Sequence, residues 1–353
     1  MPRHVMAALT AALALGAAGC AGSGRQVYTP AALRAELLGR TPPIPAADLV
    51  VPFELPPAAL ATAARVVRDA KTDREKIELL VKAMFDPKVF ALQNDGSATT
   101  TGAEALAARR GNCVAMASIF IGLARSVGLD ARYIDASSRV SETHYAEDGS
   151  TVHLGHVSAL VNTGNDRTGL DFARLGPIKW YRPLDDLEAL GHYYNNRGYD
   201  LLEDAREEGG APDWAAAERL FRLAVAVKPG FARAWNNLGI AAARQGRRDD
   251  AVGAYREATR LDPTLSAAHA NLGAVWLQAG DLPAALRELG RAAELDPKGA
   301  DIQYNLAVAR LRSGDRPGAL QALRRAISLR ASYPGARALL ERLAPGSPGA
   351  GGG

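Results

Sequence analysis

The sequence predicts two parts of different fold class, an α+β domain followed by an all-α repeat region. One observation is a strongly apolar helical pattern that opens at Cys113 and is followed by segments rich in β-forming residues. A second is a pattern that returns every 34 residues between about residues 191 and 343. The third is composition: 48% hydrophobic and 23% charged residues are ordinary for soluble globular domains.

Length and charge exclude several classes of protein. The 353 residues are enough for about two domains. A formal net charge of +4 is small for this length, and no run of Lys and Arg is interleaved with aromatics, so we expect no nucleic-acid partner. The histidines lack ligand spacing and no Gly-rich phosphate loop is present, so we expect no metal and no cofactor.

Residues 1–19 are predicted to be a signal peptide. Their apolar run is too short to span a bilayer as a stable helix. The run ends in Ala17-Ala18-Gly19-Cys20, which resembles a bacterial lipobox, although Leu is usual where Ala17 stands. The resemblance implies a lipid on Cys20 and a chain anchored to a membrane of the cell envelope, on its periplasmic or extracytoplasmic side. An ordinary cleaved signal with an incidental cysteine is the alternative.

Residues 20–56 are expected to form a tether and lead-in that holds one short helix, near residues 31–38. From residue 57 the chain becomes helical, with apolar residues at three- and four-residue steps over 58–70 and 73–85. A further short helix is expected to deliver the chain to Cys113.

Cys113 is the only cysteine outside the first twenty residues, so no disulfide framework is expected. It follows Gly111-Asn112 and opens an apolar stretch that predicts a central, buried helix. The free N–H groups and the dipole of a helix N-terminus favour an anion, and therefore a thiolate. The alternative is that Cys113 is simply a small buried hydrophobe, as most lone cysteines are.

Beyond this helix the pattern predicts three strands. Residues 131–135 are the first and residues 156–161 the second, with a polar loop over 137–155 between them. Turn residues over 162–169 precede a third strand that begins at Leu170, so the second and third strands are predicted to form a hairpin.

A catalytic cysteine needs a base and a third group that orients the base. His156 heads one strand of the predicted hairpin and Asp171 lies on the next, where side chains can reach hydrogen-bonding range. His144 and His153, both in the expected loop, are rival bases. Asp166, in the expected turn, is a rival acid.

These motifs resemble the transglutaminase-like superfamily over residues 57–185. The resemblance implies a papain-like α+β fold in which Cys113 attacks a carbonyl carbon. His156 would hold the ion pair and protonate the departing amine, and Asp171 would fix the tautomer. Ser158 and Phe172 depart from the usual family residues and leave substrate preference open. The matching motifs are Gly111-Asn112-Cys113, Ala124 to Arg132, Gly155-His156-Val157 and Leu170-Asp171-Phe172.

The second part repeats itself. Asn237-Leu238-Gly239 returns 34 residues later as Asn271-Leu272-Gly273 and again, as Asn305-Leu306-Ala307, after the same step. This period and consensus resemble the tetratricopeptide repeat, a helix–turn–helix unit. The resemblance implies a solenoid of about four repeats and a capping helix within residues 191–343, with an insertion near residues 207–213. The Gly- and Pro-rich residues 344–353 are expected to be disordered.

Two functions fit this organisation. The first is an envelope-anchored thiol enzyme that acts on peptide or amide bonds through a cysteine thioester, with hydrolysis favoured over cross-linking because water is always present. Its repeats would bind a protein or peptide in their concave groove. The alternative is a non-catalytic repeat scaffold, a lipoprotein of envelope assembly whose first domain has lost its chemistry.

Overall fold

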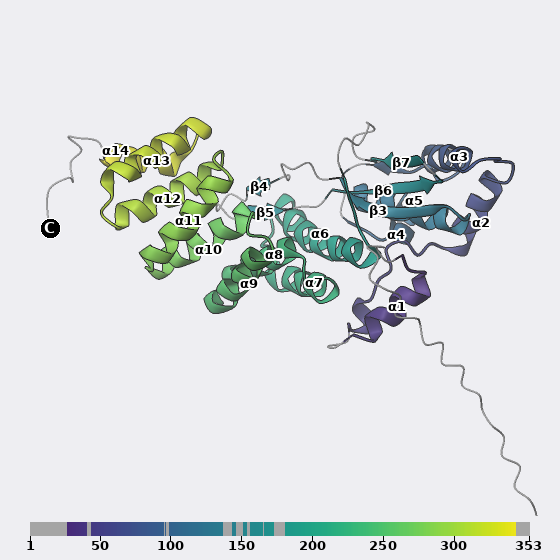
Figure 1. The fold of residues 1–353 in the computed structure, drawn as a ribbon, viewed down its shortest axis with the longest axis horizontal. Helices are drawn as coiled ribbons and strands as arrows, with labels where there is room; N and C mark the ends of the chain where they lie inside the picture. The colour runs from purple at the N-terminus through teal and green to yellow at the C-terminus, as the bar shows by residue number, and fades with distance from the viewer. Residues whose placement is uncertain are drawn as a thin grey trace, which may run out of the picture.

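A computed structural model describes residues 27–40, 44–94, 96, 99–136, 143–145, 151–153, 156–164, 166–172 and 181–343. Figure 1 places a sheet-containing part at one end and a helical array that runs to the other end. The predicted signal peptide 1–19, Cys20 and the tail 344–353 lie outside the described residues. No helix in the described ranges combines the length and the apolar character that crossing a membrane requires.

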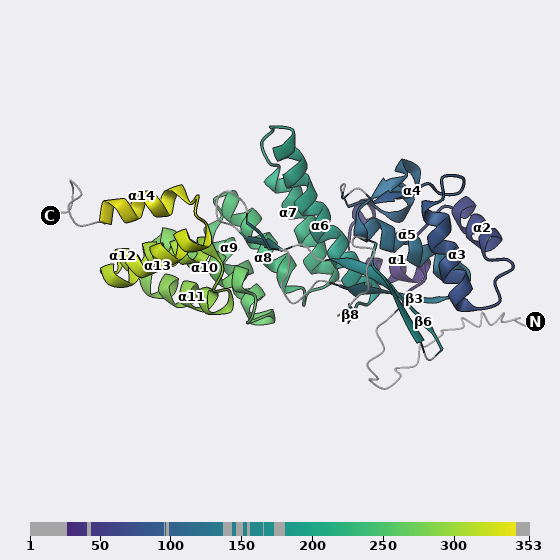
Figure 2. The same cartoon turned by 90° about the horizontal axis from the view of Figure 1, so that it is seen from above.

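The first part is built on an antiparallel four-stranded sheet whose strand order is β7-β6-β3-β8. Helix α5 (Cys113–Ser126) packs on β3 and β6, and α2, α3 and α4 pack against α5 (Figure 2). The strands are β3 (Asp130–Asp135), β6 (Val157–Thr163), β7 (Asp166–Leu170) and β8 (Arg182–Pro183); the helices are α2 (Pro57–Val66), α3 (Asp73–Phe85) and α4 (Gly102–Ala108).

Helix α5 is the centre of this core, as the sequence predicts. Every residue from Val114 to Ala124 is buried. At Gly122 the chain allows no side chain, because a Cβ there would lie 2.5 Å from the carbonyl oxygen of Phe53. The hydroxyl of Tyr133, on β3, donates to Ser118 of α5 over 2.9 Å, so the helix and the sheet are also joined by a buried hydrogen bond.

The prediction that residues 20–56 form a tether and lead-in is wrong for the described part, which folds onto the domain. Helix α1 (Pro30–Leu38) buries Leu33 and Leu37 completely, on one face of the helix. A short 3₁₀ turn (Ala46–Asp48) follows, and Phe53 then enters the core beside Tyr133. Apolar residues spaced along the segment therefore dock a stretch whose composition resembles a linker.

The predicted hairpin forms with different limits. Strand β7 begins at Asp166, inside the stretch expected to be a turn, because Gly164 turns the chain at a φ of +64°. The expected polar loop holds a separate two-stranded sheet of β4 (Thr143–Tyr145) and β5 (Thr151–His153). The helix predicted over 58–70 stops at Val66. A further short parallel ribbon joins β1 (Gln93–Asn94) to β2 (Arg110–Gly111).

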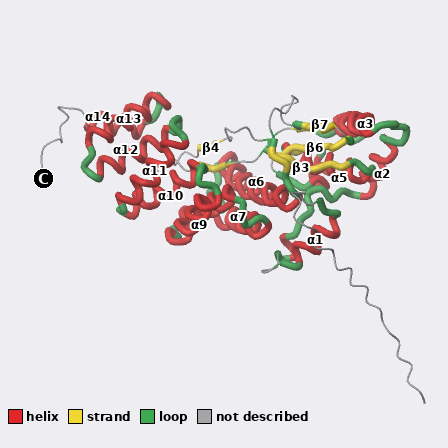
Figure 3. The backbone as a smooth tube through the Cα atoms, viewed as in Figure 1, coloured by secondary structure: helices red, strands yellow, loops and turns green. Residues whose placement is uncertain are grey.

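The second part is a stack of helix pairs, as Figure 3 shows in red. The residues of the insertion expected in the first repeat begin at Glu207, the last residue of its first helix, and otherwise lie between that helix and the next. Small residues let each pair close: a Cβ on Gly239 would lie 2.6 Å from the ring of Tyr255. The pairs are α6 (Asp186–Glu207) with α7 (Trp214–Val227), α8 (Ala232–Arg244) with α9 (Arg248–Leu261), α10 (Ser266–Ala279) with α11 (Leu282–Leu295), and α12 (Ala300–Arg312) with α13 (Arg316–Leu329), followed by α14 (Pro334–Leu343).

Candidate active site

Cys113 is the first residue of α5 and is partly exposed. Asn112 caps the helix, and its Oδ1 accepts hydrogen bonds from the N–H groups of Val114 (3.1 Å) and Ala115 (3.2 Å). This cap places Cys113 in the first turn of α5, at the positive end of the helix dipole.

The two candidate partners stand at the same end of the β6–β7 hairpin. His156 directly precedes β6 and Asp171 directly follows β7, and the register pairs Ala159 with Leu170. The sequence predicts Asp171 on this strand, but Asp171 lies one residue beyond the end of β7. His156 Nε2 lies 2.9 Å from Asp171 Oδ1, and both side chains are largely buried.

His156 also contacts Cys113, so one imidazole joins the other two side chains. Burial lowers the pKa of His156, but the hydrogen bond and charge of Cys113, together with those of Asp171, outweigh it and raise the pKa to about 9. At neutral pH the ring is therefore protonated. A protonated imidazole that is close to both a carboxylate and a sulfur is the arrangement that thiol catalysis uses.

The rival residues stand elsewhere. Asp166 pairs with Thr163, at the opposite end of the hairpin from Asp171. His144 and His153 lie on β4 and β5, in the separate two-stranded sheet, whereas His156 reaches both Cys113 and Asp171. Within the described residues, no three His, Cys, Asp or Glu side chains gather as a metal site would require.

Sequence reasoning missed the side chains that support this site. Asn94, in β1, donates from its Nδ2 to the carbonyl oxygen of Phe172 over 2.5 Å, so the ribbon leading to Cys113 is tied to the residue after Asp171. Nothing in the local sequence around Asn94 signals this contact. Asn112 could have been found, because Asn directly before an apolar helical run is a preferred helix cap.

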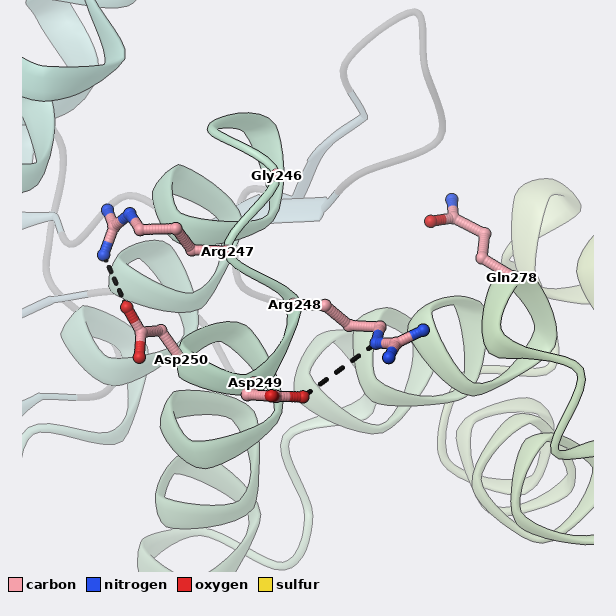
Figure 4. A pocket seen from close by; sticks show the side chains of 6 residues that line it. All are labelled: Gly246, Arg247, Arg248, Asp249, Asp250 and Gln278. Atoms are coloured by element: carbon pink, nitrogen blue, oxygen red, sulfur yellow. Dashed lines mark hydrogen bonds and ion pairs between the residues drawn. The ribbon is translucent and has the colours of Figure 1, made fainter.

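A hollow of about 570 Å³ lies on the repeats, at the turn between α8 and α9 (Figure 4). Its charged side chains are paired with each other: Arg247 contacts Asp250 at 2.7 Å and Arg248 contacts Asp249 at 3.9 Å. Because these charges are matched within the hollow, it offers no unbalanced charge to a ligand.

Comparison with protein families identifies both parts. Residues 60–161 match the family model of the transglutaminase-like superfamily. Residues 232–265 match a tetratricopeptide repeat, and residues 275–314 match a second model of the repeat. The chain therefore consists of a transglutaminase-like domain followed by a tetratricopeptide-repeat region, which confirms the fold class predicted from the sequence.

Among solved structures the chain is similar to repeat proteins. MamA is 24% identical with a TM-score of 0.36, over 41% of this chain and 82% of that one. YrrB, described as a repeat protein with an unusual peptide-binding site, is 21% identical with a TM-score of 0.36, over 44% and 77%. PilF of Pseudomonas aeruginosa is 18% identical with a TM-score of 0.40, over 44% and 68%. No curated protein matches the chain.

Proposed function

We propose that the chain is a thiol enzyme that acts on peptide or amide bonds through a thioester on Cys113. The observation that carries this proposal is the contact of His156 with both Cys113 and Asp171. Nucleophile, base and orienting acid in that order are the minimum set for covalent acyl transfer. The match of residues 60–161 to the transglutaminase-like superfamily supports the same chemistry.

The proposed reaction has two halves. The Cys113 thiolate adds to the carbonyl carbon, and the resulting oxyanion accepts from the backbone N–H of Cys113 at the helix end. His156 gives its proton to the leaving amine as the C–N bond breaks, which leaves a thioester. Neutral His156 then takes a proton from water, whose oxygen attacks the thioester and releases the acid and the thiolate. Asp171 holds the ring in place through both halves.

Hydrolysis is the outcome we favour over transfer to an amine. Water reaches a partly exposed thioester without a dedicated site. An amine acceptor would need a binding site of its own beside the thioester. The products of a reaction run with and without an added primary amine distinguish the two outcomes by mass.

The repeats supply the second half of the proposal. Tetratricopeptide repeats offer a concave face that binds peptides or helices, and we assign that role to the stack of α8, α10 and α12, where α8 and α10 also contact strand β5 of this chain. A lipid on Cys20 would hold both parts at a membrane of the cell envelope, on the periplasmic or extracytoplasmic side. The protein or peptide bound by the repeats would then be presented close to Cys113.

Alkylation of Cys113 by iodoacetamide tests the enzyme directly. Near pH 7 we expect Cys113 to react at least about tenfold faster than free cysteine, because a larger share of it is thiolate. His156→Ala should remove most of that advantage, while His269→Ala, which changes a histidine of the repeats paired with Glu288, should leave it intact. If Cys113 reacts like free cysteine and His156→Ala changes nothing, the non-catalytic scaffold is the better function.

The substrate can be sought with the same chain. Cys113→Ala removes the nucleophile and should leave the repeats and the rest of the domain folded, so a bound substrate would persist through purification. Mass spectrometry of what co-purifies with Cys113→Ala, compared with the wild-type protein, should show one species enriched only with the variant. Cleavage of that species by the wild-type protein would establish the reaction.

A further inference from the structure

Helix α6 is shared between the two parts of the molecule. It is the first helix of the repeat stack, yet its side chains reach the transglutaminase-like domain at Asp186 and again at Asp200. These positions are about 21 Å apart along the helix axis. Helix α5 has nearly the same length: α6 bonds directly to Arg125 near its C-terminal end, and at its N-terminal end α6 bonds to Thr99, which bonds to the cap residue Asn112.

At the C-terminal end of α5 the contact is a buried ion pair. Arg125 donates two parallel hydrogen bonds to Asp186, from Nη1 to Oδ2 (2.9 Å) and from Nη2 to Oδ1 (2.8 Å). Asp186 is 2% exposed and also accepts from the backbone N–H of Tyr28. This end of the nucleophile helix is therefore fixed to the first turn of α6.

At the N-terminal end the contact is a relay of three side chains. Asp200 accepts a hydrogen bond from the backbone N–H of Thr99 over 2.5 Å. Thr99 is completely buried, and its Oγ1 accepts from Nδ2 of Asn112 over 2.7 Å. Asn112 in turn caps α5 at Cys113.

The chemistry of these groups fixes the orientation of the Asn112 amide. The hydroxyl oxygen of Thr99 is an acceptor, so the NH₂ group of Asn112 turns towards it. The amide oxygen of Asn112 is thereby turned to the N–H groups of the first turn of α5, where a cap must have an acceptor.

We propose that Asp200, on the first repeat helix, is a positioning residue for Cys113, which it acts on through Thr99 and Asn112. The inference rests on the proposed function of Cys113. Without Asp200 the backbone N–H of Thr99 loses its acceptor, so Thr99 and the amide of Asn112 that bonds to it are held less firmly. The first turn of α5, and with it Cys113, is then positioned less firmly against His156. The repeats are in this sense part of the active-site framework.

The test is the pH dependence of Cys113 alkylation in the full chain. Asp200→Ala removes the acceptor, and Thr99→Val removes the hydroxyl while it keeps the side-chain shape and the Thr99 N–H. We expect each variant to slow alkylation at pH 7 by about five- to tenfold and to move the half-maximal rate to higher pH by about one unit. The double variant should be alkylated no more slowly than either single variant, because both substitutions break the same relay.

Glu203→Gln is the matched control, since it removes a negative charge from the same helix at a side chain that contacts Arg206 and not Thr99. Glu203→Gln should leave the pH dependence of Cys113 alkylation unchanged. Asp200→Asn should restore part of the lost rate, because an amide oxygen still accepts from the Thr99 N–H. Thermal unfolding of each variant separates a shifted profile from a damaged fold.

The outcomes distinguish the two proposals. If wild-type Cys113 is activated but Thr99→Val and Asp200→Ala have the wild-type profile, the positioning role is wrong and the enzyme proposal stands. If wild-type Cys113 itself behaves as free cysteine, the enzyme proposal fails before the relay is tested. Additive losses in the double variant would show that Thr99 and Asp200 act separately, which would also overturn the relay.

Discussion

The candidate site of the first part and the helix stack of the second place their polar side chains in different ways. In the transglutaminase-like domain the polar groups of the site stand at the ends of elements: Asn112 before α5, His156 before β6 and Asp171 after β7. In the repeats buried asparagines stand inside helices and bond from one repeat to the next, as Asn237 does to Asn195 over 2.8 Å. The first arrangement brings reactive groups together at one place, whereas the second repeats the same kind of hydrogen bond between successive repeats.

The comparison implies that a broken contact should cost more in the domain than in the repeats, and buried ion pairs should show the largest difference. Arg125→Ala leaves the carboxylate of Asp186, 2% exposed, without its main partner, and we expect a loss of about 3 kcal/mol in the free energy of unfolding. The matched change is Arg330→Ala in the repeats, whose partner Asp301 is also buried, at 4% exposed, but whose own side chain is 39% exposed against 16% for Arg125. Because solvent reaches the Arg330 pair more readily, we expect a smaller loss there, of about 2 kcal/mol. Denaturant unfolding measures both, and equal losses would contradict the comparison.

Glycine-to-alanine changes should give the next largest effect. Gly122→Ala puts a methyl group 2.5 Å from a backbone oxygen that cannot move aside, and we expect a loss of about 2 to 3 kcal/mol. Gly239→Ala meets the ring of Tyr255, which can shift, so it should cost less. Gly253→Ala has no heavy atom within 4 Å of the new methyl group and should stabilise α9 by about 0.5 to 1 kcal/mol. Thermal unfolding of the three variants should keep this order.

Two buried histidines should give opposite pH dependences of stability. The pKa of His156 is raised to about 9, so its contribution is complete below about pH 6.5 and is lost as pH rises through 9. Burial lowers the pKa of His192, on α6, to about 4, against the opposing charge of Asp135. Its contribution is complete above about pH 6.5 and is lost as pH falls through 4.

We expect each of these pH effects to reach about 2 kcal/mol. His156→Gln should flatten the alkaline side of the stability profile, and His192→Gln should flatten the acid side. Chemical unfolding at a series of pH values measures both. A His156→Gln protein that still loses stability between pH 6.5 and 9 as the wild type does would show that another group titrates there.

The smallest effect concerns the asparagines. Asn237→Ala removes a buried amide from the bond between the first and second repeats, and we expect a loss of about 1 to 2 kcal/mol. Asn305 occupies the corresponding position two repeats further on and is only partly buried. Asn305→Ala should therefore stay within about 0.5 kcal/mol of the wild type. Melting temperatures of the two variants are a sufficient measurement.

How much the sequence predicted also differs between the two parts. The repeats are local: each helix pair contacts mainly its neighbours, so a 34-residue period was enough to locate α8 to α13. In the domain the burial of α5 and the convergence of Cys113, His156 and Asp171 were predicted, because apolar pattern and motif order carry that information. The limits of β7 were not predicted, because residues 166–169, which were expected to form part of the turn, pair with β6.

The tertiary structure decided what no local pattern could express. The sequence determined two fold classes, the helix that begins at Cys113 and the residues able to activate it. Only the fold could show that Leu33 and Leu37 dock the lead-in, because linker-like and docked segments share a composition. Only the fold could bring Asp200 and Thr99 to Asn112, since side chains so distant in sequence meet through the packing of whole elements. The helix that opens at Cys113 is thus predicted by its own residues and held at both ends by a helix of the repeats.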